Sequence, residues 1–81
     1  MATFERVQMV IGDILGCEQE DIQPSTTLEN DLGADDIDLI ELQMDLEEEF
    51  SLEIPDCDWE KLLKGTVANI VRYVDEWRSQ S

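Results

Sequence analysis

The sequence predicts a small all-α protein of four helices, with a long ordered loop between the first two and a short third helix. Apolar residues recur at steps of three and four in four separate segments, which is the spacing of one face of a helix. No segment alternates apolar and polar residues for long enough to predict a sheet. With 81 residues, 42% of them apolar, the chain can bury one small core, so we expect a single domain over residues 1–81.

The first helix is predicted over residues 4–15, because its apolar positions follow helical spacing and Gly16 stands where a C-cap glycine belongs. Residues 17–35 show no sustained period and are rich in residues that favour turns and caps. A loop of this length is uncommon in a compact domain and is usually either functional or disordered. Its scattered apolar residues, Ile22 and Leu28 among them, predict that it packs back on the domain and is ordered.

The second helix is predicted from about Asp36 or Ile37 to Phe50, and its apolar side chains separate into two stripes. The wider one, here called the core stripe, should face the interior and consists of Leu39, Leu42, Leu46 and Phe50. The other, here called the second stripe, consists of Ile37, Ile40 and Met44 and is bordered by Glu41, Glu47 and Glu48. An apolar strip with an acidic border is typical of a docking surface. The alternative is that the second stripe also enters a core pressed from both sides.

Two further helices are predicted near the C-terminus. Pro55 interrupts helical backbone, and Asp56 can cap a short third helix that ends near Gly65 and contains Trp59, Leu62 and Leu63. Thr66 can cap a fourth helix in which Val67, Ile70, Val71 and Val74 repeat at helical spacing.

The charge balance restricts the class of partner. Five basic residues against 21 acidic ones give a net charge of −16, which repels phosphate backbones and anionic lipid headgroups. We therefore expect no nucleic-acid or membrane binding, and partners that present basic patches. Acidic chains can also be disordered, but helical spacing throughout favours a folded one.

The start of the chain lacks a cationic region followed by an apolar one, and no apolar run approaches the length of a membrane span. This pattern predicts a cytoplasmic protein. Cys17 and Cys57 are too few for a disulfide framework, so we expect both to be reduced and to serve as small core residues.

The chain contains no histidine, and therefore lacks the usual general base near neutral pH and the commonest transition-metal ligand. A cysteine nucleophile would have no imidazole to activate it. We expect no catalytic residues and no enzyme activity.

The acid-rich segments 31–38 and 56–60 suggest calcium, which prefers oxygen ligands. The spacing fails the EF-hand test, since counting from Asp31 puts Asp36 where the glycine belongs and Leu42 where the final glutamate belongs. No dedicated metal site is predicted, although weak divalent binding and a calcium-responsive acidic bundle stay open.

Residues 32–38 read Leu-Gly-Ala-Asp-Asp-Ile-Asp, residues 45–50 read Asp-Leu-Glu-Glu-Glu-Phe, and residues 53–56 read Glu-Ile-Pro-Asp. In this order, and over nearly the whole chain, the sequence resembles the bacterial acyl carrier proteins. The resemblance implies a small four-helix bundle and a noncatalytic carrier of fatty-acid or related acyl-chain biosynthesis. It also implies a serine at the start of the second helix that is esterified by 4′-phosphopantetheine, whose thiol carries the growing acyl chain.

The sequence departs from that family at one position. The family motif reads Asp-Ser-Leu or Asp-Ser-Ile, whereas Asp35-Asp36-Ile37 stands here, so that Asp36 occupies the place of the serine. A hydroxyl forms a stable phosphodiester, but a carboxylate on phosphorus gives a labile mixed anhydride, and we expect this chain to stay unmodified. Structurally, Asp36 is expected to act as a helix cap. Three explanations stay open: a serine deliberately replaced, a natural paralogue that binds partners without cargo, or an error in the recorded residue.

The recognition surface of the family coincides with the second stripe and its acidic border. Residue by residue, it corresponds to Asp35, Ile37, Asp38, Ile40, Glu41, Met44, Glu47 and Glu48. The partners implied are a phosphopantetheinyl transferase and acyl-chain biosynthetic enzymes with basic patches. This chain is expected to bind them as a monomer. The alternative is a non-carrier interaction or regulatory protein that uses the same acidic helix.

Overall fold

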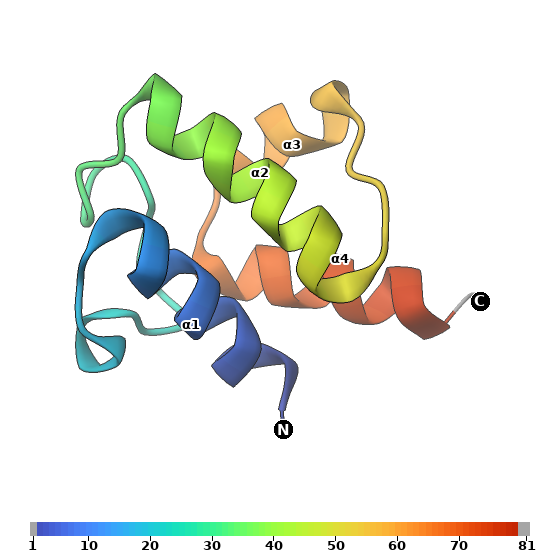
Figure 1. The fold of residues 1–81 in the computed structure, drawn as a ribbon, viewed down its shortest axis with the longest axis horizontal. Helices are drawn as coiled ribbons and strands as arrows, with labels where there is room; N and C mark the ends of the chain where they lie inside the picture. The colour runs from blue at the N-terminus through green and yellow to red at the C-terminus, as the bar shows by residue number, and fades with distance from the viewer. Residues whose placement is uncertain (1, 80–81) are drawn as a thin grey trace.

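The structure, a computed structural model, describes residues 2–79, which form four α-helices and one short 3-10 helix (Figure 1). The elements are α1 (Thr3–Leu15), η1 (Gln19–Asp21), α2 (Asp36–Phe50), α3 (Asp56–Leu63) and α4 (Val67–Ser79). Within residues 2–79 there is no β-strand, and Thr27 and Thr66 form an isolated bridge. The predicted fold class is confirmed, including the short third helix.

The helices enclose one cluster of buried apolar side chains. In Figure 1, α2 crosses above α1 and α4, and α3 lies near the top of the molecule, while α1 packs against both α2 and α4. The buried cluster draws on every α-helix and on the loops, and comprises Val7, Val10, Ile11, Ile22, Leu28, Leu39, Leu42, Leu46, Phe50, Leu52, Ile54, Trp59, Leu62, Val67, Ile70 and Val74. All four residues of the core stripe belong to it, as predicted.

Arg6 ties α1 to the C-terminal end of α2. Its Nε lies 2.9 Å from Oε2 of Glu49, its Nη2 donates to the Glu49 carbonyl at 2.8 Å, and its guanidinium lies 4.5 Å from the centre of the Phe50 ring. Because both charged side chains are partly exposed, the ion pair itself contributes at most about 1 kcal/mol. Its main effect is to fix the side chains where the two helices meet.

The loop between α1 and α2 is packed against the domain, as predicted. Gly16 ends α1 in the left-handed conformation (φ 68°), which costs glycine little. Ile22 and Leu28 are then buried to 0% and 1% exposure. The side-chain amide of Gln8 donates to the carbonyls of Gln19 and Ile22 at 3.1 and 2.7 Å, so that α1 holds the first part of the loop.

The same loop caps α4. The backbone N–H groups of Val67 and Ala68 donate to the carbonyls of Thr26 and Pro24 at 2.8 and 2.9 Å. These N–H groups have no partner inside the helix. Thr66 precedes α4 as predicted, and the loop carbonyls accept these two bonds. Loop and helix therefore stabilise each other.

Two predictions about individual residues are wrong. The N-cap of α3 is Pro55, and Asp56 is the first helical residue; its Oδ1 accepts instead from the Gln43 amide of α2 at 3.1 Å. Cys57 is exposed and only Cys17 packs against the core. The reason is helical phase: Cys57 comes two residues before the buried Trp59, which turns it about 200° away from the core.

Candidate functional site

The start of α2 is fixed by a reciprocal pair of hydrogen bonds. Asp35 is the N-cap: its Oδ1 accepts from the Asp38 N–H at 2.9 Å, and Asp38 Oδ2 accepts from the Asp35 N–H at 3.5 Å. This capping box satisfies helix N–H groups that would otherwise lack partners. The prediction that Asp36 caps the helix is wrong by one residue, because Asp35 has the extended backbone (φ −95°, ψ 179°) that a cap requires.

The chain before α2 approaches along a fixed path. Thr27 and Asp31 exchange bonds, with the Thr27 N–H donating to Asp31 Oδ2 at 2.9 Å and the Asp31 N–H donating to Thr27 Oγ1 at 3.2 Å. Gly33 turns the chain in the left-handed region (φ 67°), and the Ala34 N–H donates to the carbonyl of Leu28 at 3.0 Å. These contacts anchor the end of the loop on a buried leucine.

Asp36 lies at the tip of this anchored end. It is the first residue of α2, and its side chain is exposed. The helix dipole favours a negative charge at this end, so a carboxylate is well accommodated. From Asp36 to Phe50, α2 contains neither serine nor threonine.

The second stripe lies on the outer surface of α2. Ile37, Ile40 and Met44 are 68%, 58% and 59% exposed, so the alternative of a core pressed from both sides is wrong. Glu41 and Glu48 beside them are also exposed, and α2 carries no basic residue. Three large apolar side chains left in water next to free carboxylates form a surface suited to a partner that is apolar at its centre and basic at its rim.

Glu47, predicted in the acidic border, is engaged inside the molecule. It is half-buried, and its Oε2 accepts from the backbone N–H of Ile54 at 2.9 Å. The amide of Gln43 donates to the Ile54 carbonyl at 2.8 Å, so two side chains of α2 hold both backbone polar groups of one buried residue. Sequence reasoning missed Gln43, and its one signal was a polar residue flanking the core stripe.

The predicted surface residues thus fall into two groups. The structure brings the exposed side chains together on one side of α2: Ile37, Ile40, Met44, Glu41 and Glu48. The other group contributes charge from carboxylates that already accept hydrogen bonds inside the molecule: Asp35, Asp38 and Glu47.

Comparison with known proteins connects this geometry to a family. Residues 5–74 match the family model described as a phosphopantetheine attachment site. The chain is 43% identical over 75 residues to the acyl carrier protein of Campylobacter jejuni subsp. doylei, an alignment that covers 93% of this chain and 95% of that protein. The chain belongs to the acyl carrier protein family.

Acyl carrier proteins are carriers rather than catalysts, hold 4′-phosphopantetheine, and interact with biosynthetic enzymes and a phosphopantetheinyl transferase. The residues of α2 do not fit covalent attachment of that group, because a phosphodiester needs a hydroxyl and α2 offers only carboxylates, amides and apolar side chains.

Two further properties of the described chain bear on function. Within residues 2–79, no group of three or more His, Cys, Asp or Glu side chains is placed to hold a metal ion. In the same range, no helix is both long enough and apolar enough to cross a membrane.

Proposed function

We propose that this chain is an acyl carrier scaffold of fatty-acid or related acyl-chain biosynthesis in which Asp36 occupies the attachment position for 4′-phosphopantetheine. The observation that carries the proposal is the position of Asp36: an exposed first residue of α2, presented by an anchored loop and followed directly by the second stripe. A transferase must reach the attachment residue and the helix behind it, and both are open to solvent.

In the proposal, the carboxylate prevents attachment. The transfer reaction forms a bond between a nucleophilic oxygen of the carrier and the phosphorus of phosphopantetheine. With a carboxylate oxygen that bond would be a mixed anhydride, which water cleaves readily. In this proposal the chain with Asp36 docks to the partners of a carrier and carries no acyl group.

The docking surface consists, in this proposal, of the second stripe together with Asp35, Asp38, Glu41, Glu47 and Glu48. Apolar contact with Ile37, Ile40 and Met44 supplies affinity, whereas the carboxylates steer a basic partner into place. Steering of this kind gives fast association and ready release, as successive handovers require, and it weakens as salt rises. We place the protein in the cytoplasm as a monomer with one domain over residues 1–81.

The test compares intact masses of this chain and of Asp36→Ser after incubation with coenzyme A, Mg²⁺ and a broad-specificity phosphopantetheinyl transferase. Asp45→Ser is the matched control, since it adds an exposed serine to the same helix outside the second stripe. We expect only Asp36→Ser to gain the mass of phosphopantetheine. A gain by Asp45→Ser, or by the unchanged chain, would refute the assignment of position 36.

The second candidate is a natural interaction or regulatory protein that docks basic partners through the same helix and never carries cargo. One observation favours it: Asp36 suits the helix end that it occupies, so the fold shows no strain from lacking the serine. Loading separates the two candidates. If modified Asp36→Ser accepts an acyl group from an acyl-chain enzyme, the scaffold is that of a carrier; modification without loading favours the interaction protein.

A further inference from the structure

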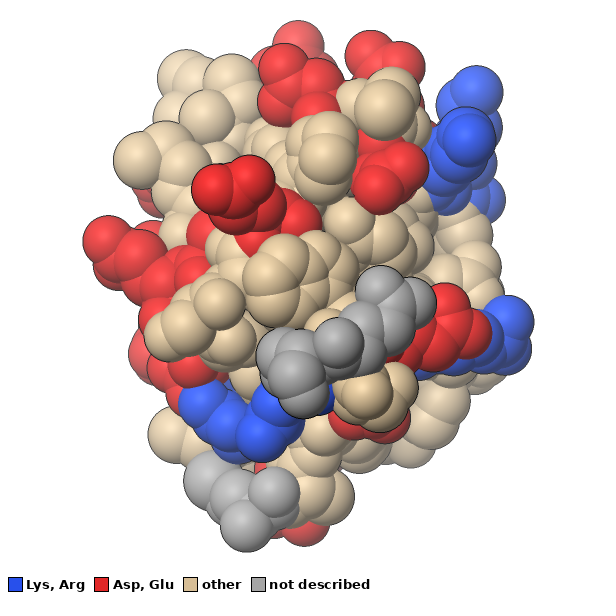
Figure 2. Space-filling view, turned by 90° about the vertical axis from the view of Figure 1, so that its right-hand side faces the viewer, with Lys and Arg blue, Asp and Glu red and all other residues tan. Residues whose placement is uncertain are grey.

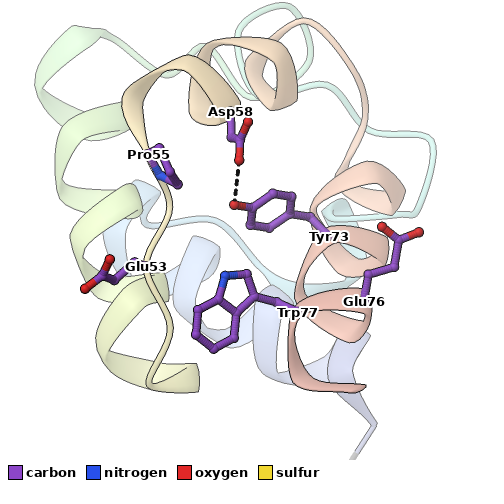
Figure 3. Close-up of a pocket in the computed structure, with 6 residues that line it drawn as sticks. All are labelled: Glu53, Pro55, Asp58, Tyr73, Glu76 and Trp77. Atoms are coloured by element: carbon purple, nitrogen blue, oxygen red, sulfur yellow. Dashed lines mark hydrogen bonds between the residues drawn. The ribbon is translucent and has the colours of Figure 1, made fainter. Parts of the chain in front are cut away.

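A hollow lies apart from the start of α2, between α3, α4 and the segment that joins α2 to α3. Its volume is about 330 Å³, and Figure 3 shows its walls. The lining combines two aromatic rings, a proline and three carboxylates: Tyr73, Trp77, Pro55, Glu53, Asp58 and Glu76. We call it the aromatic hollow.

The aromatic wall comes from α4. In Figure 3 the rings of Tyr73 and Trp77 project from that helix toward α3 and the 53–55 segment. Trp77 is 36% exposed, whereas the other tryptophan, Trp59, is 5% exposed and belongs to the core. An indole ring beside an open hollow offers its electron-rich face to a ligand, and tryptophan is the best aromatic partner for a cation.

The carboxylate of Asp58 lies opposite Tyr73. Asp58 is half-buried, and its Oδ2 accepts from the Tyr73 hydroxyl at 2.9 Å. Its Oδ1 has a distant contact with the Cys57 thiol, at 3.9 Å. A carboxylate accepts about four hydrogen bonds, so Asp58 retains capacity for a donor that enters the hollow. Burial and the bond to Asp58 raise the pKa of Tyr73 to about 12, so the phenol stays a neutral donor at physiological pH.

The residues that line the aromatic hollow include three acids and no base, and one of the acids, Glu76, also borders a neighbouring hollow lined by Lys61 and Arg72. The ion pair of Arg6 with Glu49 involves none of these three acids. Figure 2 looks onto the side where α4 ends: acidic groups (red) spread over the left and upper parts and also lie beside basic groups (blue) at the right, and further basic groups lie at the lower left. The lining of the aromatic hollow is therefore acidic, and the partly exposed ring of Trp77 lies among its carboxylates.

The arrangement selects a flat organic cation. In Figure 3, Glu53 and Glu76 stand on opposite sides of the hollow, and among the described residues no group of three or more His, Cys, Asp or Glu side chains is placed to hold a metal ion. A guanidinium is planar, stacks on aromatic rings and presents five donors to carboxylates. Its flat surface matches Trp77 and its donors match Asp58.

We propose that the aromatic hollow receives the guanidinium of an arginine side chain from a basic partner protein, stacked on Trp77 and hydrogen-bonded to Asp58. This contact adds a second anchor, away from the second stripe, and would fix the orientation of the partner. It involves no modification at position 36, so its failure and the failure of the proposed carrier role are distinguishable.

The test uses the full chain, labelled with ¹⁵N, and N-acetyl-arginine N-methylamide as the probe. The neutral isostere N-acetyl-citrulline N-methylamide is the control ligand. We expect the arginine probe to shift the indole N–H signal of Trp77 while the Trp59 signal stays in place, and the citrulline compound to bind at least about threefold more weakly, as loss of a charge beside an aromatic ring and a carboxylate predicts. Equal shifts with both compounds would overturn the proposal.

Two variants locate the site. Trp77→Leu and Asp58→Asn should each weaken binding of the arginine probe by about three- to fivefold. Because Trp77→Leu lacks the reporting indole, its binding is followed through the Trp59 and backbone signals. Asp13→Asn, an exposed acid on α1, changes the net charge by the same amount and should leave binding unchanged. Asn keeps an acceptor for Tyr73, so Asp58→Asn is expected to fold. If Asp13→Asn weakens binding as much as Asp58→Asn, the attraction is diffuse and the proposal fails.

Discussion

At the start of α2, two neighbouring aspartates differ in what their side chains do. Asp35 bonds to the Asp38 N–H and caps the helix, whereas the Asp36 side chain lies free in solvent. The residue that sets the structure is therefore adjacent to the residue proposed for attachment. This separation lets position 36 change between aspartate and serine with little effect on the fold.

The first prediction tests this separation. Asp35→Ala should lower the free energy of unfolding by about 1 kcal/mol, because the helix loses its cap. Asp36→Ser should change it by less than about 0.5 kcal/mol, as exposed positions usually do. Urea denaturation followed by circular dichroism measures both, and a larger loss for Asp36→Ser would show that the cap has been misplaced.

The second prediction concerns Glu47, which we place both in the docking surface and in a structural bond. Glu47→Ala leaves the N–H of buried Ile54 without its acceptor and should cost about 1–3 kcal/mol. Glu47→Gln keeps an acceptor oxygen and should cost less. Glu48→Ala, on the exposed side of the helix, should leave stability within about 0.5 kcal/mol. Equal losses for Glu47→Ala and Glu48→Ala would contradict this role.

At the scale of elements, periodicity predicted the helices and their buried faces because those depend on neighbours three and four residues away. The core stripe of α2 is buried as its spacing predicts. The cap of α2 was missed by one residue because two adjacent aspartates suit the position equally, and the choice depends on the turn at Gly33 and the tether from Ala34 to Leu28.

The aromatic hollow and the bond from Glu47 to Ile54 depend on segments that meet only in the folded chain. In the sequence, Trp77 is far from Pro55 and Asp58, and the three residues line one hollow only because the folded chain brings α4 next to α3 and the segment before it. Likewise, the sequence shows Glu47 only as one acid of a charged run. Its bond to Ile54 forms because the chain runs back along α2 after Ser51. Contacts of this kind cannot be predicted from the spacing of neighbouring residues in the sequence.

The third prediction concerns the contact of α3 with α4 through Asp58 and Tyr73. The pKa of Tyr73 rises from 10.0 to about 12 through burial and the hydrogen bond to Asp58. Between about pH 10 and pH 12 the unfolded chain loses the phenol proton while the folded chain keeps it, so ionisation favours unfolding and stability falls with rising pH. Below about pH 10 this contribution is fully present.

Tyr73 is the one tyrosine of the chain, so its ionisation can be followed by ultraviolet absorbance. The stability advantage over Tyr73→Phe, measured by urea denaturation, should shrink from about pH 10 to about pH 12. A phenol that titrates near its reference value in the folded chain would contradict the contact.

For the molecule as a whole, net charge produces two opposite responses to salt. At −16 the acidic surface repels itself in the folded chain, and α2 contributes seven acids without a base. Screening relieves this repulsion, yet it also weakens attraction to a basic partner. Stability and docking should therefore move in opposite directions.

The fourth prediction follows. Raising NaCl from about 20 mM to about 300 mM should increase Tm by about 5 °C, which corresponds to about 1 kcal/mol for a domain of this size, and should weaken binding to the phosphopantetheinyl transferase. Mg²⁺ and Ca²⁺ at matched ionic strength separate general screening from specific divalent binding. Salt-insensitive partner binding would contradict steering by the acidic helix.

The central claim is that position 36 is the attachment position of an otherwise intact carrier scaffold. Peptide mass mapping of Asp36→Ser, after incubation with coenzyme A, Mg²⁺ and the transferase, tests it most directly because it locates the added group. We predict phosphopantetheine on the peptide that contains position 36 and nowhere else. Attachment at another residue, or none with a transferase that modifies the Campylobacter relative under the same conditions, would contradict the claim.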